Sequence, residues 1–202
     1  MENTFTIEKY CHVSSQNLSV NGTVLYESGG APSKDFLKEI YRNEKLAYPK
    51  FFKMDVLSQL TFITAELVLS ENRNKPQTAL VLSNKSSSVD TDRRHQESIA
   101  TDDAFFPSPA VFVYTLPNIG MGEVAIRHQL QTENAFFVFE QFDAEFLHQY
   151  CESLRGQHSV SQVLCGWTEV HHDVCEAFVY LLSENGKIPH TLENLEKLYA
   201  QL

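Results

Sequence analysis

The chain has 202 residues, 43% of them hydrophobic and 21% charged, and a formal net charge of −10. This length and composition fit one soluble globular domain, and we expect a single domain over residues 1–202. The acidic charge argues against a nucleic-acid partner, no apolar run approaches the roughly 18 residues that cross a membrane, and no signal peptide is visible, so we expect a cytoplasmic protein without a membrane span.

The first third of the chain predicts one strand followed by two helices. Thr4–Val13 is expected to be a strand, and the polar, glycine-bearing segment Ser14–Ala31 an irregular excursion. A helix is expected over Lys34–Asn43. A second helix is expected over Met54–Ser70, where apolar residues recur at spacings of three and four, and it should stop before Pro76.

The middle of the chain begins with Thr78–Leu82, a continuously apolar run that is typical of a central parallel strand. The polar segment Ser83–Asp103 predicts a loop with a helical part. It lacks the glycines that a phosphate-binding loop needs.

The segment that ends at Gln141 organises the chain. A turn-rich stretch leads into a short helix over Glu123–Leu130, and the unbroken apolar run Ala135–Phe139 is typical of a strand buried on both faces. This strand should end in a strand-to-helix corner at Glu140 and Gln141. In many α/β enzymes such a corner holds the nucleophile, because a helix N-terminus favours an anion, but a glutamine cannot serve as one.

The last third predicts a helix, two strands and a final helix. The first helix covers Phe142–Arg155 and should stop at Gly156, and the last covers Thr191–Leu202. Thr78–Leu82, Ala135–Phe139 and Gln162–Trp167 should be the central strands. Gln162–Trp167 and Cys175–Leu182 are expected to be antiparallel, towards one edge of the sheet. The predicted fold class is therefore α/β, with about five mostly parallel strands and helices on both faces.

From about Lys53 onward the chain resembles the N-terminal half of a β-ketoacyl synthase, which has the thiolase fold. The resemblance is carried by several short motifs in the right order: Lys53-Met54-Asp55, Leu80-Val81-Leu82-Ser83, Ser108-Pro109, Leu116-Pro117-Asn118 with Gly122, and Leu164–Glu169, where the family has a strand and a glycine-rich turn. It implies a thiolase-like half-fold.

The resemblance also implies that the corner has lost its catalytic residue. An active ketosynthase carries an acyl-accepting cysteine there, and the alignment of motifs places Gln141 at that position. Glu140-Gln141 after Val138 resembles the Val-x-Glu-Gln of chain length factors, the non-catalytic partners of ketosynthases in polyketide pathways. The two catalytic histidines of the family belong to a second half without a counterpart here. We therefore expect a pseudoenzyme with no catalytic residue and a degenerate active-site position at Glu140 and Gln141.

The leading hypothesis is a chain-length-factor-like partner in fatty-acid, polyketide or polyene biosynthesis that shapes the acyl tunnel of an active ketosynthase. The expected dimer and tunnel residues are Phe136, Phe137, Phe139 and Phe142. The expected partner is a full-length ketosynthase or a second copy of this chain, with an acyl carrier protein as a further candidate.

A dimer is also expected from packing. One sheet cannot bury the apolar faces of both Val56–Leu67 and Phe142–Arg155 unless the C-terminal helix folds back as a cover. The strand Ala135–Phe139 should present an apolar edge, and two such strands should pair antiparallel across a two-fold axis. A charge at Phe137 should then yield monomer or insoluble protein.

Two alternatives stay open. The chain could be a thioester hydrolase or acyltransferase that uses Cys165 or Cys175 with His171 or His172, or it could be a free-standing acyl-binding module. The two adjacent histidines also suggest a metal, but they should point to opposite sides of a hairpin loop, and no second cluster completes a site. We expect no metal site and no cofactor. His148 is expected at the surface.

Overall fold

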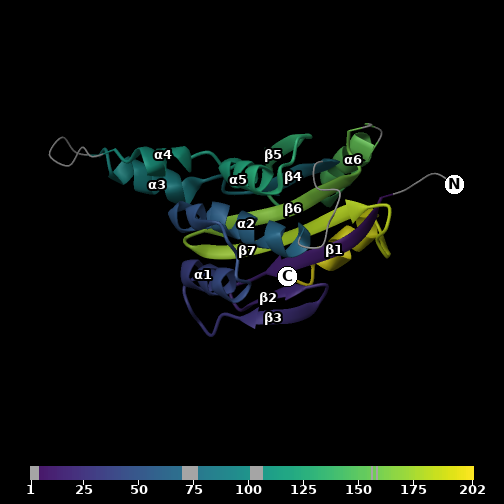
Figure 1. The fold of residues 1–202 in the computed structure, drawn as a ribbon, viewed down its shortest axis with the longest axis horizontal. Coiled ribbons are helices and arrows are strands. Elements are labelled where there is room, and N and C mark those ends of the chain that lie inside the picture. Colours follow the sequence, from purple (N-terminus) through teal and green to yellow (C-terminus); the bar gives the residue numbers. More distant parts are fainter. Residues whose placement is uncertain (1–4, 70–76, 101–106, 156, 158) are drawn as a thin grey trace.

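A computed structural model describes residues 5–69, 77–100, 107–155, 157 and 159–202. Within this part of the chain, one eight-stranded sheet has the order β3-β2-β1-β7-β6-β4-β5, with β8 beside β1, and Figure 1 shows it running from β5 at the top to β3 at the bottom. The strands are β1 (Thr6–Val13), β2 (Asn17–Val20), β3 (Thr23–Glu27), β4 (Thr78–Asn84), β5 (Asn134–Val138), β6 (Gln162–His171), β7 (Val174–Ser183) and β8 (Ile188–Pro189).

The sheet is mixed rather than mostly parallel. Only the pairs β4–β5 and β4–β6 are parallel, and the other pairs are antiparallel. The α/β class is confirmed, but the expectation of about five mostly parallel strands is wrong. Tight hairpins join β2 to β3 and β6 to β7, and such short connections can only join antiparallel neighbours.

The segment predicted to be irregular, Ser14–Ala31, is instead a β-hairpin of β2 and β3. Its turn is Asn21-Gly22, and both residues have positive φ, 51° and 78°. Asn-Gly is the preferred pair for such a two-residue turn, because both residues tolerate the left-handed region. The Asn21 side chain also accepts a hydrogen bond from the Tyr10 backbone N–H at 3.0 Å, which fastens the turn to β1.

Helices cover both faces of the sheet, as predicted. They are α1 (Ser33–Asn43), the 3-10 helix η1 (Pro49–Lys53), α2 (Val56–Leu69), α3 (Val89–Glu97), α4 (Pro109–Val113), α5 (Ile119–His128), α6 (Ala144–Arg155) and α7 (Leu192–Tyr199). One apolar core joins α1, α2 and α5 to one face of the sheet, and a second joins α6 and α7 to the other. The Thr191 hydroxyl accepts from the Asn194 N–H and caps α7, as expected. The predicted stops at Pro76 and Gly156 lie outside the described residues.

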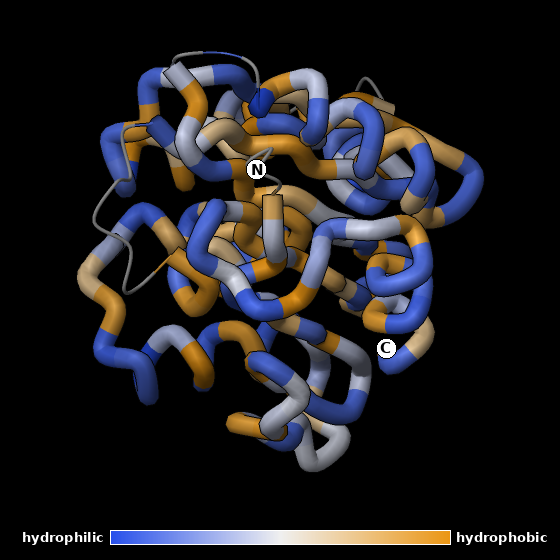
Figure 2. The backbone as a smooth tube through the Cα atoms, turned by 90° about the vertical axis from the view of Figure 1, so that its right-hand side faces the viewer, coloured by the Kyte–Doolittle hydropathy of each residue, from blue (hydrophilic) through white to orange (hydrophobic). Residues whose placement is uncertain are grey.

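The helix α2 is buried all round, and this is more than its pattern of apolar residues predicts. Some of its polar side chains have hydrogen-bond partners inside the fold. Gln59 donates to the Phe51 carbonyl at 3.0 Å, and the Thr64 hydroxyl donates to the Leu60 carbonyl one turn back at 2.9 Å. Figure 2 shows the same organisation, with apolar segments gathered inside and polar ones on the outer helices and loops.

The placement of α2 and α6 corrects the packing argument for a dimer. The two helices lie on opposite faces of the sheet, so they do not compete for the same apolar surface. The C-terminal helix α7 does fold back beside α6, as that argument required. The apolar faces of both long helices are therefore buried within the chain, and a dimer has to be argued from other surfaces.

Two strand positions differ from the prediction. The run Ala135–Phe139 was expected in the centre of the sheet, but β5 is an edge strand whose residues are partly exposed. β6 is central, as predicted, but β7, expected at an edge, also lies inside the sheet, because β1 pairs with its other side. The segment Leu164–Glu169 forms no turn and belongs to the continuous strand β6.

An ion cluster between α2 and α5 predicts a pH effect on stability. Burial alone would raise the pKa of Glu66, but His128, with Nε2 2.6 Å from its carboxylate, and Arg127 outweigh burial and lower it. A depressed carboxyl pKa contributes stability above its ordinary value of 4.5, and this contribution is lost as the pH falls through the folded-state value.

We therefore expect Glu66→Gln to lower the free energy of unfolding by about 1–3 kcal/mol at pH 7 and to weaken its dependence on pH below 5. Urea denaturation between about pH 3 and 7 measures both effects. The exposed Glu97→Gln serves as the control and should change stability by less than about 0.5 kcal/mol. Equal pH dependence in the wild type and Glu66→Gln would contradict the assignment.

Candidate functional site

The strand-to-helix corner lies between Val138, the last residue of β5, and Ala144, the first of α6. Glu140 and Gln141 are both exposed in this corner. Asp143 caps α6, because its side chain accepts from the Phe146 N–H at 2.9 Å. Gln141 thus lies at the predicted junction but two residues before the cap, outside the helix. Its equivalence to the catalytic cysteine of ketosynthases stays a prediction.

The corner opens onto a cleft of about 570 Å³, in the size range of small-molecule sites. Residues 139–145 form one wall, and Leu192, Glu196 and Tyr199 of α7 form the other. The described residues that line it include no cysteine, serine, threonine or histidine. The cleft can therefore hold a ligand, but its described lining lacks the cysteine or serine nucleophile and the histidine base that commonly carry out acyl transfer.

Phe142 and Tyr199 form the apolar floor of this corner cleft. Their rings stack at 4.3 Å, and Phe142 also packs edge-on against Trp167 and Phe178 in the core. Burial, together with its hydrogen bond to Glu176 at 3.0 Å, raises the pKa of Tyr199. Its hydroxyl therefore stays protonated at neutral pH. Because Phe142 is buried within the chain, it can influence a partner only through its neighbours.

The other predicted dimer and tunnel residues divide between the two faces of β5. Phe137 and Phe139 stack at 5.8 Å and pack edge-on against Phe146 of α6, forming a half-buried aromatic cluster that Tyr150 completes. Phe136 faces the opposite side and packs against the core of α2 and α5. The phenylalanines of β5 thus fasten the edge strand to its own fold.

An apolar groove runs between the free edge of β5 and α5. It has a volume of about 400 Å³, and none of its described lining residues is charged: Pro117, Asn118, Met121, Gly122, Asn134, Phe136 and Val138. Phe112 and Leu116, which precede the groove in the chain, and Val138 are 61%, 56% and 54% exposed. The name edge groove is used below for the groove lined by the seven residues given above, without Phe112 and Leu116. Exposed apolar side chains beside the open edge of a strand mark an interaction site or an aggregation hazard.

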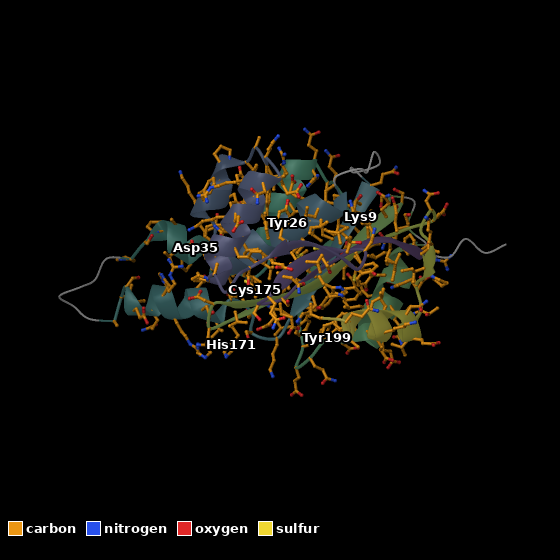
Figure 3. All side chains as sticks on the ribbon, turned by 90° about the horizontal axis from the view of Figure 1, so that it is seen from below. Lys9, Tyr26, Asp35, His171, Cys175 and Tyr199 are labelled. Atoms are coloured by element: carbon orange, nitrogen blue, oxygen red, sulfur yellow. The ribbon has the colours of Figure 1, made fainter. Side chains whose placement is uncertain are left out.

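The residues of the hydrolase alternative are not brought together. Cys165 and Cys175 are 0% and 2% exposed and belong to the cores on opposite faces of the sheet. His171 is exposed, and His172 follows it in the turn from β6 to β7; Figure 3 shows Cys175 within the fold and His171 at its margin. Burial raises the pKa of the Cys175 thiol to about 12. A buried thiol of this kind is not a nucleophile at neutral pH.

Sequence reasoning missed a cluster of His148, Glu152 and His190. The first two lie one turn apart on α6, and the third immediately precedes the cap of α7. His148 was expected at the surface, but it is half-buried against His190. The spacing of four between a histidine and a carboxylate on a predicted helix was the one signal available.

No family model matches this sequence, and no curated protein is significantly similar to it. Solved structures are similar in fold. A chain of the ishigamide ketosynthase/chain length factor is 17% identical with a TM-score of 0.67, over 92% of this chain. A chain of the ketosynthase ApeO in complex with its chain length factor ApeC, from Xenorhabdus doucetiae, is 13% identical with a TM-score of 0.62, over 98% of this chain. A β-ketoacyl synthase from Burkholderia phymatum is 10% identical with a TM-score of 0.57.

The chain therefore has the thiolase-like fold of ketosynthases and chain length factors, and the resemblance is confirmed at the level of the fold. It spans 64% of the matched ishigamide chain and 91% of the matched chain of the ApeO–ApeC complex, which is thus close to it in length. Among the described residues, no helix is long and apolar enough to cross a membrane.

Proposed function

We propose that this chain is a non-catalytic, chain-length-factor-like subunit that pairs with a full-length ketosynthase in fatty-acid, polyketide or polyene biosynthesis. The observation that carries the proposal is the edge groove beside β5. In the described part of the chain, the open edge of β5 offers a partner backbone hydrogen bonds, and the uncharged groove beside it offers apolar contact. The solved structures of similar fold support it, since two of them are ketosynthases solved with chain length factors.

The proposed role is to complete the dimer and to shape the acyl tunnel of the ketosynthase. The corner cleft supports a role without catalysis, because Gln141 cannot accept an acyl group and the described residues that line the cleft include no cysteine, serine or threonine. The aromatic cluster of Phe137 and Phe139 makes the edge strand stiff and bulky. In the dimer, such a strand would limit the length of an acyl chain that grows toward it.

Co-expression with the ketosynthase encoded nearest to this chain tests the proposal. We expect a 1:1 complex by size-exclusion chromatography with light scattering, and condensing activity in the complex that the ketosynthase alone lacks. A ketosynthase that is fully active alone and forms no complex would overturn the proposed function. If the chain pairs with a second copy of itself instead of a ketosynthase, light scattering should give a mass of twice 23.0 kDa.

The thiols give a separate prediction on catalysis. All four cysteines are buried, and burial raises the pKa of Cys11, Cys151 and Cys175. We expect the folded protein to react with a thiol reagent at pH 7 at least about 100-fold more slowly than the unfolded protein, and no acyl adduct with a reactive thioester by mass spectrometry. A single fast-reacting cysteine would instead favour the hydrolase or acyltransferase alternative.

A free-standing acyl-binding module is the remaining alternative. The edge groove is large enough for part of an acyl chain and is lined by apolar and amide side chains. If this alternative holds, the isolated chain should bind a fatty acyl thioester without any ketosynthase. Calorimetric titration of the isolated chain measures this directly.

A further inference from the structure

Three potential metal ligands meet where α6 contacts the segment that leads into α7. One ligand atom each from His148, Glu152 and His190 lies within 4.8 Å of the other two. The Glu152 Oε1 atom is 3.2 Å from Nδ1 of His190. This distance is close to the spacing of roughly 3.4 Å between two ligands that each lie about 2.1 Å from a tetrahedral zinc ion.

The contacts around the cluster orient its side chains as the outer shell of a metal site does. The Nε2 atom of His148 lies 3.0 Å from the backbone carbonyl oxygen of His190. When the Nε2–H of His148 donates to this carbonyl, Nδ1 of His148 carries the lone pair that can bind a metal ion. The second carboxylate oxygen of Glu152 accepts from the Arg155 Nε at 2.8 Å, which leaves Oε1 directed at His190. Backbone carbonyls and charged groups hold metal-binding residues in this manner in known sites.

The imidazole of His190 lies inside the fold. Its side chain is 0% exposed, and its Nε2 atom has no hydrogen-bond partner in the described part of the chain.

We propose that His148, Glu152 and His190 bind a divalent cation of the zinc class. Two imidazoles and one carboxylate suit zinc, whereas magnesium and calcium prefer shells made of oxygen atoms. His148 and Glu152 are half-buried, so a fourth position can face solvent. The ion would join α6 to the start of α7. Both helices also form walls of the corner cleft, so the ion would fix the shape of that cleft. The inference does not depend on the proposed function.

The test uses the full chain after treatment with a chelator. Titration with zinc chloride in a calorimeter should show one site per chain, and zinc should raise the melting temperature. Cobalt(II) should bind with the visible spectrum of a four-coordinate ion. His148→Ala and Glu152→Gln should each weaken zinc binding by at least roughly 10- to 100-fold, the loss seen when even outer-shell partners of a metal are removed.

A matched control separates this site from adventitious binding. His171 and His172 are the surface pair, with ring centroids 4.1 Å apart, and their double alanine variant should bind zinc like the wild type. His148 and Glu152 are chosen over the fully buried His190 because their replacement is less disruptive. Circular dichroism checks that each variant is folded. If His148→Ala does not fold, the test rests on Glu152→Gln, which keeps the shape of the side chain. The proposal is overturned if the wild type binds no zinc, or if binding survives Glu152→Gln but is lost in the surface double variant.

Discussion

Replacing Val138 by aspartate is expected to weaken the complex with the ketosynthase by at least about 100-fold, or about 3 kcal/mol. Val138 ends the edge strand, lines the edge groove and is 54% exposed in the isolated chain. A carboxylate there would be buried without a partner at the proposed interface. Because the Val138 side chain is exposed in the free chain, the substitution should change the stability of the isolated chain little.

Val174→Asp is the control for this experiment. Val174 begins β7, is also 54% exposed and lies far along the chain from the edge groove, next to the turn of the β6–β7 hairpin. Its variant should bind the ketosynthase like the wild type. The affinity of each variant is measured by immobilising it on a sensor surface and titrating it with the purified ketosynthase. Equal affinities for the two variants would place the interface elsewhere. Phe137, the position suggested by sequence, is a poorer probe, because its ring packs within the chain and a charge there would also disturb the fold.

Gly166→Ala is expected to lower the free energy of unfolding by at least about 3 kcal/mol or to prevent folding. A β-carbon on Gly166 would lie 2.1 Å from the Phe178 carbonyl oxygen and 2.8 Å from the Val179 Cα, and both atoms belong to the backbone of β7. The residue also has φ of 152°, which side chains rarely adopt. The two strands would have to separate in the middle of the sheet.

Gly122→Ala is the matched control for stability. A β-carbon at Gly122 meets nothing within 4 Å, and the residue lies inside α5. Alanine there should stabilise the chain by about 0.5–1 kcal/mol, because it restricts the unfolded backbone more than glycine does. Chemical denaturation of both variants compares them. Similar stabilities for the two would contradict the close approach of β6 and β7.

Local signals in the sequence predicted the elements of this fold better than their arrangement. The apolar periodicity of α2, the apolar run of β4 and the Thr191 cap were all visible and correct. The β2–β3 hairpin was missed because the flanking strands are short, although Asn21-Gly22 was a sufficient turn signal.

The arrangement depended on long-range pairing that no local pattern encodes. The apolar run Ala135–Phe139 looks the same in a central strand as in an edge strand covered by its own aromatic cluster. Its place at the edge follows only from the parallel pairing of β5 with β4 on one side. The pairing of β1 with β7 likewise put the last hairpin inside the sheet.

The candidate site was predicted only in part. The corner at Glu140 and Gln141 was found, because the change from an apolar run to a helical pattern is local. Its opposite wall, formed by Leu192, Glu196 and Tyr199, comes from a helix some fifty residues further along the chain and could not be inferred. The metal-ligand cluster was missed for the same reason, since His190 lies far from His148 in the sequence.

The pairing of β1 with β7 has a consequence for how the chain folds as it is made. Thr6 lies opposite Ser183 in the register, and its hydroxyl donates to the Ser183 carbonyl at 2.8 Å. The strand β1 therefore gains this sheet neighbour only after β7, which lies far later in the chain, has been made. Contacts so distant in sequence slow folding, because a long loop must close before they form. Until β7 is made, the side of β1 that it occupies in the finished sheet has no strand to pair with.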